Sequence, residues 1–379
     1  MNADKDVKKK DVTKIVAFRV DANDTIGSGH LMRCLSLAEA LKEQDVHSIF
    51  ISAQLPSILE KALDDAGCVV EYIDSNSDSD VVGPYSHSAW LGTPQEMDAE
   101  YTKEAVLKIC DAKNACLLAM VVDHYGIGAP WESILGELAP VLAIDDLCDR
   151  RHSSQFLLDQ TLGRRAEEYE ALCSKDSIIL TGTDYAILRR EFSLASPAAI
   201  PERLSRQSAQ RVLITLGAAD VGNITDLILR AVELIEQPLE VKVIAGVLNQ
   251  NFHSLTKQAV RSNHKIDVFR SSNDMSGLMR WADICIGAGG TSSWERCALG
   301  LPAINILLAD NQIMVNKSLG DFGVAVNFGA LSGDRVKELA RNVSELIGDQ
   351  KQLCRMSERA FALCDGLGAR RVAEILIRG

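Results

Sequence analysis

The sequence lacks the features of a nucleic-acid-binding or membrane protein. Its 379 residues contain 40 Lys and Arg against 52 Asp and Glu, which gives a formal net charge of −12. No basic stripe is present to neutralise phosphates, so a nucleic-acid partner is not expected. No apolar run approaches the roughly 18–20 residues of a spanning helix, and Met1 to Thr13 lacks the apolar centre of a signal peptide. We therefore expect a cytoplasmic protein without stable membrane association, and the sequence implies no protein partner.

Metal and cofactor motifs are also scarce. The ten cysteines include no Cys-x-x-Cys, and the seven histidines are dispersed without a pair at ligand spacing. Asp78-Ser79-Asp80 imitates the Asp-x-Asp of metal-dependent sugar transferases, but no strand precedes it, so a solvated loop is favoured. We expect neither a metal nor a cofactor.

The sequence does contain short apolar runs that alternate with helical patterns. This alternation predicts βαβ units, and the length predicts two domains. The expected fold is α/β, with two Rossmann-like doubly wound domains of the GT-B kind and a small-molecule site in the cleft between them. We divide the chain into a disordered tail (1–14), an N-terminal sugar and catalytic domain (15–195), a proline-containing linker (196–210) and a C-terminal nucleotide domain (211–379).

Individual elements are predicted from periodicity and turn residues. The expected N-terminal strands are 15–20, 47–51, 69–73, 116–122, 141–144 and 155–158, with a helix at 30–44 and a long loop at 74–95. The expected C-terminal strands are 211–216, 240–245, 266–269 and 283–287, with helices at 223–236, 251–262 and 292–299 and a helical tail from 335.

Charged residues gather where the N-terminal strands are expected to end. Arg19 and Asp21 end the first strand, Asp123 and Tyr125 follow the strand at Val122, and Asp145 and Asp146 follow the strand at Ile144. Of the last two, Asp145 is the expected sugar contact. Ligands of open parallel sheets bind outside the carboxyl ends of the strands, so these side chains are candidate sugar contacts. Each aspartate taken singly has an alternative role as a cap for the helix that follows it.

The first loop, Asp24 to His30, joins a strand to a helix and contains Gly27 and Gly29. It resembles the start of a dinucleotide fingerprint but lacks the third glycine. A helix dipole disfavours positive charge at its N-terminus, so His30 is expected to stay neutral near pH 7 and to act as a base. Arg33 lies one turn further on. The alternative is a capping or packing histidine.

A second glycine loop spans residues 287 to 295 (GAGGTSSWE) between a strand and a helix. Glycines and hydroxyl residues at a helix N-terminus are typical of an anion site. Glu295 is placed to accept hydrogen bonds from a ribose diol, or it is simply a favourable acid in the first helical turn. Gly217 lies in another glycine turn, and neither turn has the Lys-Ser/Thr of a P-loop. The expected nucleotide residues are Gly217, Gly289, Gly290, Thr291, Ser292 and Glu295.

Several of these segments, taken in order, resemble one family. They are RVDANDTIGSGHLMRCLSLAEAL, VVDHYGIGAPWE, AIDDLCDRRHSSQFLLDQ, TGTDYAILRREF, RVLITLGAAD and CIGAGGTSSWERCALGLPAI. The set is similar to the UDP-2,4-diacetamido-2,4,6-trideoxy-β-L-altropyranose hydrolases of pseudaminic acid biosynthesis and covers about Ile15 to Gln312. That family is similar in fold to the GT-B glycosyltransferases, including the lipid II-forming N-acetylglucosaminyltransferase.

The resemblance implies a metal-independent hydrolysis of the anomeric C–O bond with inversion, which releases the free sugar and UDP. By position, His30 matches the family's proposed base and Tyr125 a sugar-side residue. Gly289, Thr291, Ser292 and Glu295 match the UDP site, and Asn311 faces the same cleft. The chain departs from the family at Gly217-Ala218-Ala219-Asp220, where Gly-Gly-Ala-Asp is usual, and at Arg189-Arg190-Glu191-Phe192, where Arg-Pro-Glu-Phe is usual.

Other functions remain open at this point. A GT-B glycosyltransferase would use an acceptor hydroxyl in place of water, and would call for an acceptor surface that the sequence does not clearly show. A non-catalytic nucleotide-sugar-binding module would keep the loop at 287–295 without needing His30. An NAD-dependent enzyme ranks lower because the third glycine is missing.

Overall fold

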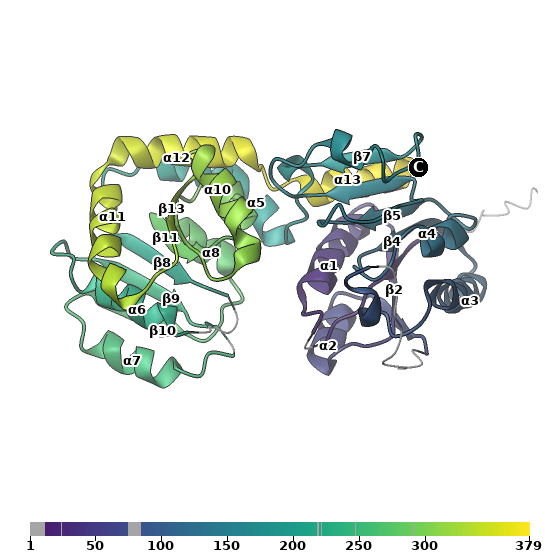
Figure 1. The fold of residues 1–379 in the computed structure, drawn as a ribbon, viewed down its shortest axis with the longest axis horizontal. Coiled ribbons are helices and arrows are strands. Elements are labelled where there is room, and N and C mark those ends of the chain that lie inside the picture. The colour runs from purple at the N-terminus through teal and green to yellow at the C-terminus, as the bar shows by residue number, and fades with distance from the viewer. Residues whose placement is uncertain are drawn as a thin grey trace, which may run out of the picture. The chain divides into compact units, whose positions relative to one another are not determined.

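The computed structural model describes residues 12–379, apart from residues 24, 75–84, 218–219, 221, 247 and 291 and the side chain of residue 311. The chain divides into two compact units (Figure 1). The first comprises the residues up to 160, together with 164–187 and 369–379, and the second comprises 161–163 and 188–368. Both units are α/β, which confirms the predicted fold class.

The first unit is built on a seven-stranded sheet in the order β3-β2-β1-β4-β5-β6-β7, with every neighbouring pair parallel. Its strands are β1 (Thr13–Arg19), β2 (His47–Ser52), β3 (Val69–Tyr72), β4 (Ala115–Val122), β5 (Val141–Ile144), β6 (Phe156–Asp159) and β7 (Ile178–Thr181). Its helices are α1 (Gly29–Lys42), α2 (Ser57–Asp65), α3 (Gln95–Lys113), α4 (Ala129–Leu135) and α13 (Gly368–Arg378), with 3-10 turns η1 (Ser88–Trp90), η2 (Ala166–Tyr169) and η3 (Thr183–Tyr185).

Successive residues of β1 enter two different cores, because side chains alternate across a strand. Val16 and Phe18 pack with residues of α1 and α13, such as Leu31 and Val372. Ile15 and Ala17 pack with residues of α3 and α4 on the other face. Both faces of the sheet are therefore covered, and central strands such as β4 are mostly apolar.

The second unit has a six-stranded parallel sheet in the order β10-β9-β8-β11-β12-β13. Its strands are β8 (Arg211–Thr215), β9 (Glu240–Ile244), β10 (Lys265–Phe269), β11 (Ile284–Ala288), β12 (Ala303–Ile306) and β13 (Ala325–Gly329). Its helices are α5 (Arg190–Leu204), α6 (Ile224–Val232), α7 (Phe252–Val260), α8 (Met275–Trp281), α9 (Ser292–Ala298), α10 (Ile313–Asp321), α11 (Val336–Gly348) and α12 (Gln350–Leu363), with 3-10 turns η4 (Asp310–Gln312) and η5 (Gly333–Arg335). Strands β7, β12 and β13 were not predicted.

Each sheet has one point where the strand order reverses. In the first unit it lies between β1 and β4, and in the second between β8 and β11. Loops that leave the carboxyl ends of these neighbouring strands diverge to opposite faces, which opens a crevice for a ligand. The loops that contain His30 and Gly289 follow β1 and β11, so both predicted sites lie at such reversal points.

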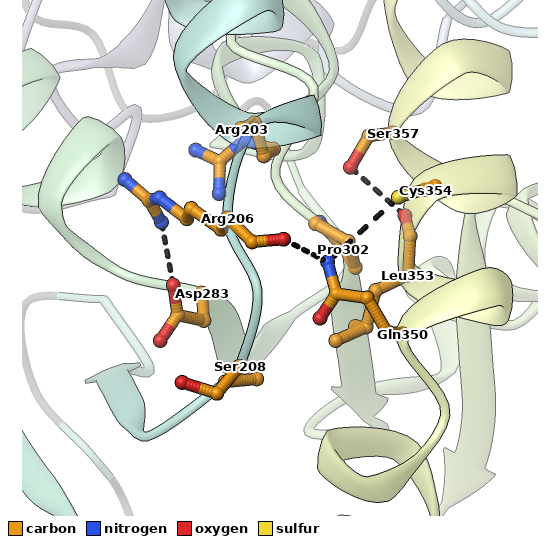
Figure 2. Close-up of a pocket in the computed structure, with 10 residues that line it drawn as sticks. Arg203, Arg206, Ser208, Asp283, Pro302, Gln350, Leu353, Cys354 and Ser357 are labelled. Atoms are coloured by element: carbon orange, nitrogen blue, oxygen red, sulfur yellow. Dashed lines mark hydrogen bonds and ion pairs between the residues drawn. The ribbon is translucent and has the colours of Figure 1, made fainter.

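The predicted linker at 196–210 is wrong. Residues 190–204 form α5, and the segment belongs to the second unit. Arg203 donates to the carbonyl oxygens of Met279 and Ala282 at the end of α8, and Arg206 pairs with Asp283 at 2.6 Å. Figure 2 shows these side chains beside a small hollow, where Gln350 also donates to the Arg206 carbonyl at 3.0 Å. The hollow contains none of the predicted site residues.

Three further boundaries change. Helix α13, drawn in yellow among the strands of the first unit in Figure 1, contributes Val372 and Leu376 to the first core, so the second unit does not extend to residue 379. The predicted tail ends sooner, because β1 begins at Thr13, and residues 1–11 lie outside the described part. The predicted loop at 74–95 includes η1 in its described portion. Within the described residues, no helix combines the length and apolarity needed to cross a membrane.

Candidate active site

The residues nearest the reversal point of the first sheet form a histidine–carboxylate pair. His30 lies in the first turn of α1, and Asp123 directly follows β4. The His30 Nδ1 atom lies 2.6 Å from Asp123 Oδ1, and both residues are buried, at 8% and 0% exposure. No described residue hydrogen-bonds the other ring nitrogen, Nε2. A carboxylate at Nδ1 favours the tautomer in which Nδ1 donates and Nε2 accepts, as in a catalytic dyad.

Arg33 fixes the Asp123 carboxylate from the opposite side. Its Nε and Nη2 atoms donate to the two carboxylate oxygens at 2.5 and 2.7 Å. Burial alone would raise the pKa of Asp123, but Arg33 and His30 hold it well below its usual range. Asp123 therefore stays ionised, and its orientation is set by the Arg33 guanidinium and the His30 imidazole, both from α1.

Asp146 and Tyr125 complete this cluster. Arg33 Nη1 pairs with Asp146 Oδ2 at 2.6 Å, and the Tyr125 hydroxyl donates to the same oxygen at 3.0 Å. Burial and the nearby Asp146 raise the pKa of Tyr125, so its hydroxyl remains a donor. The Tyr125 ring meets the His30 ring edge to face, with centroids 4.5 Å apart.

Arg19 and Asp21 were predicted beside the sugar, but they lie in a separate buried network. Arg19 has 0% exposure and donates to Asp98 of α3 from Nε and Nη2, while its Nη1 pairs with Asp21 at 2.8 Å. Asp98 also accepts from the Trp131 indole. This network joins β1, α3 and α4. We therefore assign Arg19 and Asp21 to positioning and do not carry them forward as sugar contacts.

Asp145 is also turned inward, at 0% exposure. Its oxygens accept from the Leu147 and Cys148 amides, from Arg150 and from Tyr169. Nearby, His152 lies between Glu132 and Asp145, with nitrogen–oxygen distances of 2.7 and 3.5 Å. Asp145 therefore holds the loop after β5, and its neighbour Asp146 is the residue that contacts the His30 cluster.

Gly27 and Gly29 border the His30 cluster on an exposed loop. Gly27 has φ +78°, a conformation that favours glycine, and a Cβ at either residue would meet nothing within 4 Å. Both positions are open, as expected for a loop that admits a ligand.

In the second unit, the side chain of Arg296 anchors the glycine loop that follows β11. Its guanidinium is buried and donates to the Ala288 carbonyl, the Ser292 and Ser293 hydroxyls and Asn305. Gly290 has open space where a side chain would extend. Arg296 thus anchors Ala288 before the loop and Ser292 and Ser293 after it, and Gly290 borders open space.

Asn316 of α10 approaches the same loop. Its side chain is 1% exposed, and neither its Nδ2 nor its Oδ1 atom has a hydrogen-bond partner among the described residues. A Cβ on Gly289 would lie 1.8 Å from Asn316 Oδ1, so only glycine fits there. An unpartnered buried amide is costly unless a ligand or water completes its hydrogen bonds.

Glu295 lies in the first turn of α9, as predicted, but it already has a partner. Its Oε1 atom accepts from Arg189 Nη2 at 2.9 Å and from Nε at 3.2 Å. Burial raises the pKa of Glu295, and Arg189 opposes that shift. Both of these hydrogen bonds use Oε1, and neither uses the second oxygen, Oε2.

Gly217 follows β8 with φ +97° and open space around it. Asp220, a few residues later, accepts from the Ile224 and Thr225 amides and so occupies the N-terminus of α6 with the protein's own carboxylate. Residues 218 and 219, Thr291 and the Asn311 side chain lie outside the described part, so their predicted roles stay predictions.

The structure thus brings His30, Arg33, Asp123 and Tyr125 together, and it keeps Gly289, Gly290, Ser292 and Glu295 on one loop and helix start. Sequence reasoning placed Asp146 beside Asp145 at the end of β5 but selected only Asp145 as a sugar contact. It missed Arg296 and Asn316, which carried no usable signal. Across the described ranges, no three His, Cys, Asp or Glu side chains gather as a metal site, and Asp78 and Asp80 are not among the described residues.

Comparison with known proteins agrees with the two-domain α/β fold. The two sheets form a GT-B fold: the MurG crystal structure from Acinetobacter baumannii matches with a TM-score of 0.68 and 16% identity, covering 97% of this chain and all of that chain. Residues 211–372 match the model of the glycosyltransferase family 28 C-terminal domain.

Two curated relatives extend the match into the first unit. The spore coat polysaccharide biosynthesis protein SpsG of Bacillus subtilis strain 168 is 25% identical over 377 residues, covering 95% of this chain and 97% of the relative. The UDP-2,4-diacetamido-2,4,6-trideoxy-β-L-altropyranose hydrolase of Campylobacter jejuni serotype O:2 is 25% identical over 266 residues, covering 70% and 81%. The chain is a GT-B protein whose relatives include nucleotide-sugar enzymes.

Proposed function

We propose that this protein hydrolyses the anomeric C–O bond of a UDP-sugar with inversion, and that its substrate is UDP-2,4-diacetamido-2,4,6-trideoxy-β-L-altropyranose. The observation that carries the proposal is the His30–Asp123 pair at the reversal point of the first sheet. The similarity to the Campylobacter hydrolase supports the choice of substrate, and the SpsG relative supports a role in polysaccharide biosynthesis.

In this mechanism His30 activates a water molecule. Asp123 holds the proton on Nδ1, so Nε2 accepts a proton from water as the water oxygen bonds to the anomeric carbon. The C–O bond to the diphosphate breaks on the opposite face of the sugar, and its electron pair stays on the phosphate oxygen. Attack from the face opposite the leaving group inverts the anomeric configuration.

The departing diphosphate requires charge stabilisation more than protonation. We assign this role to the loop of Gly289, Gly290 and Ser292 at the start of α9, with Thr291 as predicted from the sequence. Asn316 provides a buried amide whose donors and acceptor are free within the described residues. Glu295 keeps one carboxylate oxygen for the ribose diol.

The second candidate is a glycosyltransferase, in which an acceptor hydroxyl takes the place of water. The glycosyltransferase family model over residues 211–372 and the likeness to MurG favour it. The same His30–Asp123 pair serves either nucleophile. A non-catalytic binding module is less favoured, because it has no need of that pair.

One experiment separates these functions. The purified protein is incubated with a panel of UDP-2,4-diacetamido-2,4,6-trideoxyhexoses and UDP-N-acetylglucosamine in ¹⁸O-water, with no acceptor. Hydrolysis predicts UDP release, ¹⁸O in the sugar and an inverted anomer by NMR. Release of UDP only after an acceptor is added would identify a transferase, ¹⁸O in UDP would overturn C–O cleavage, and binding without turnover would identify a binding module.

A further inference from the structure

The segment between β3 and β4 has no role in the mechanism above, yet its described part is built against the His30 cluster. Gln95, at the start of α3, accepts from the Gly128 amide at 2.8 Å. Gly126 lets the chain approach closely, since a Cβ there would lie 3.0 Å from the His87 carbonyl oxygen. Asp98, three residues beyond Gln95, is tied to Arg19. These contacts anchor residues 85–98 to the loop after β4, which contains Asp123 and Tyr125.

This anchoring gathers three aromatic rings. The His87 and Trp90 centroids are 4.5 Å apart, and those of His87 and Tyr125 are 5.4 Å apart. The Trp90 and Tyr125 rings lie within 28° of parallel at 5.8 Å. All three side chains are half-buried. We call His87, Trp90 and Tyr125 the aromatic platform.

The platform continues directly into the catalytic pair. Tyr125 contacts the Trp90 ring and also the edge of the His30 ring, at 4.5 Å between centroids. The Nδ1 atom of His87 is buried and has no hydrogen-bond partner in the described part of the chain. Such an atom is costly unless a ligand or water completes its hydrogen bond. Aromatic faces with a few polar groups are the usual lining of a small-molecule site.

We propose that the aromatic platform binds the C–H face of the substrate's hexose and so positions its anomeric carbon at His30. A sugar ring presents axial C–H groups on one face, and a 6-deoxy sugar adds a methyl group, whereas its hydroxyl and acetamido groups project from the rim. Stacked aromatic rings bind the C–H face of the sugar, and His87 Nδ1 is the polar atom that can bond a group on its rim. This inference rests on the proposed function for the identity of the sugar, and it assigns sugar binding to Trp90 and His87.

The test compares Trp90→Ala and Trp90→Phe with a matched control, Trp281→Phe. Trp281 is also half-buried, but it lies in the second unit and stacks with Lys242. With UDP-2,4-diacetamido-2,4,6-trideoxyhexose as substrate, Trp90→Ala should raise KM roughly tenfold with kcat reduced less. A tenfold change corresponds to about 1.4 kcal/mol, which is within the range of one aromatic contact. Trp90→Phe should stay within about threefold of wild type, and Trp281→Phe should not differ.

UDP affinity serves as an internal check, since UDP itself carries no hexose. All three variants should bind UDP as wild type does. Equal KM values for wild type and Trp90→Ala, or a parallel loss of UDP affinity, would overturn the platform.

A binding readout keeps this test separate from catalysis. The free 2,4-diacetamido-2,4,6-trideoxyhexose should change the tryptophan fluorescence of wild type and Trp281→Phe in a saturable way, and not that of Trp90→Phe. If wild type shows this change but turns over no UDP-sugar, the platform stands and the proposed reaction fails. No saturable change in wild type would overturn the platform whatever the turnover shows.

Discussion

The two points at which the strand order reverses are lined by different kinds of residue. In the first unit the start of α1 supplies His30 and Arg33, and the loops after β4 and β5 supply Asp123, Tyr125 and Asp146. These five side chains form one hydrogen-bonded network. In the second unit the loop after β11 and the start of α9 supply glycines and serines. The nearby Asn305 and Asn316 have buried polar atoms without a hydrogen-bond partner among the described residues.

The difference corresponds to two tasks. Proton transfer needs a titratable group whose orientation and charged neighbours are fixed before the substrate arrives, and the Asp123–Arg33 pair fixes His30 in this way. Binding a nucleotide diphosphate needs close backbone approach and neutral donors that are free to bond the ligand. The charged side chains at the reversal point of the first sheet therefore pair with one another. Near the reversal point of the second sheet, Asn305 and Asn316 keep amide atoms without a partner among the described residues.

The comparison predicts its largest effect at His30. His30→Asn should lower kcat by roughly 10²–10⁴-fold, the usual contribution of a general base, and should leave UDP affinity unchanged. Asn tolerates a helix start, so loss of a cap would not explain the drop. Steady-state kinetics and a UDP titration measure the two quantities. Near-normal turnover would make His30 a structural residue, and a loss of UDP affinity as well would require repeating the test with His30→Gln.

A second prediction concerns stability, because the first unit also buries charges away from the site. Burial would lower the pKa of His152, but Asp145 and Glu132 raise it to about 9. Since the unfolded value is about 6.5, this interaction stabilises the fold fully below pH 6.5 and is lost as pH rises through 9. The expected loss is up to about 3 kcal/mol, because the two pKa values differ by about 2.5 and each pKa unit corresponds to 1.36 kcal/mol.

Denaturant midpoints of wild type and His152→Gln between pH 6 and 10 test this. Wild type should lose stability across pH 7–10, and the variant should show a flatter profile from a lower starting value. If the denaturant midpoints of the two proteins fell equally with pH, another group would be responsible for the loss of stability at alkaline pH.

The second unit gives a smaller prediction at Glu295. Glu295→Ala should weaken UDP binding by about 1–3 kcal/mol, since the ribose hydroxyls lose their acceptor. Arg189 pairs with the same carboxylate, so Arg189→Gln is the matched control. Isothermal titration of the two single variants and the double variant separates the ribose contact from release of Arg189. UDP affinity that is insensitive to Glu295→Ala would place the ribose elsewhere.

The contrast between the units also explains what the sequence could predict. His30, Asp123 and Tyr125 follow recognisable strands, so the rule for parallel sheets was enough to group them. Asp145 and Asp146 were both placed at the end of one strand, but Asp145 was selected as the sugar contact because the sequence does not show which of two adjacent side chains points inward.

Longer-range features carried no local signal. The partner of Arg19 is Asp98, 79 residues away, and Asn316 reaches Gly289 from a different helix. Pro197 and Pro201 favoured a linker, yet they lie inside α5, where Phe192, Ala195 and Ala199 are buried. Tertiary packing there outweighs the cost of proline in a helix.

The smallest expected effect is that of a chelator, which should leave turnover unchanged. The carboxylates of the first reversal point already have hydrogen-bond or ion-pair partners. Asp123 bonds to His30 and Arg33, Asp146 bonds to Arg33 and Tyr125, and Asp145 bonds to Arg150 and two amides. A divalent cation would have to displace these partners, because it requires several free oxygen ligands. UDP release is measured before and after EDTA treatment, then after addition of Mg²⁺ or Mn²⁺, with His30→Asn as the inactive reference. Activity that is lost in EDTA and restored by either cation would contradict the prediction, and it would direct attention to Asp78 and Asp80, whose spacing imitates a metal-binding motif.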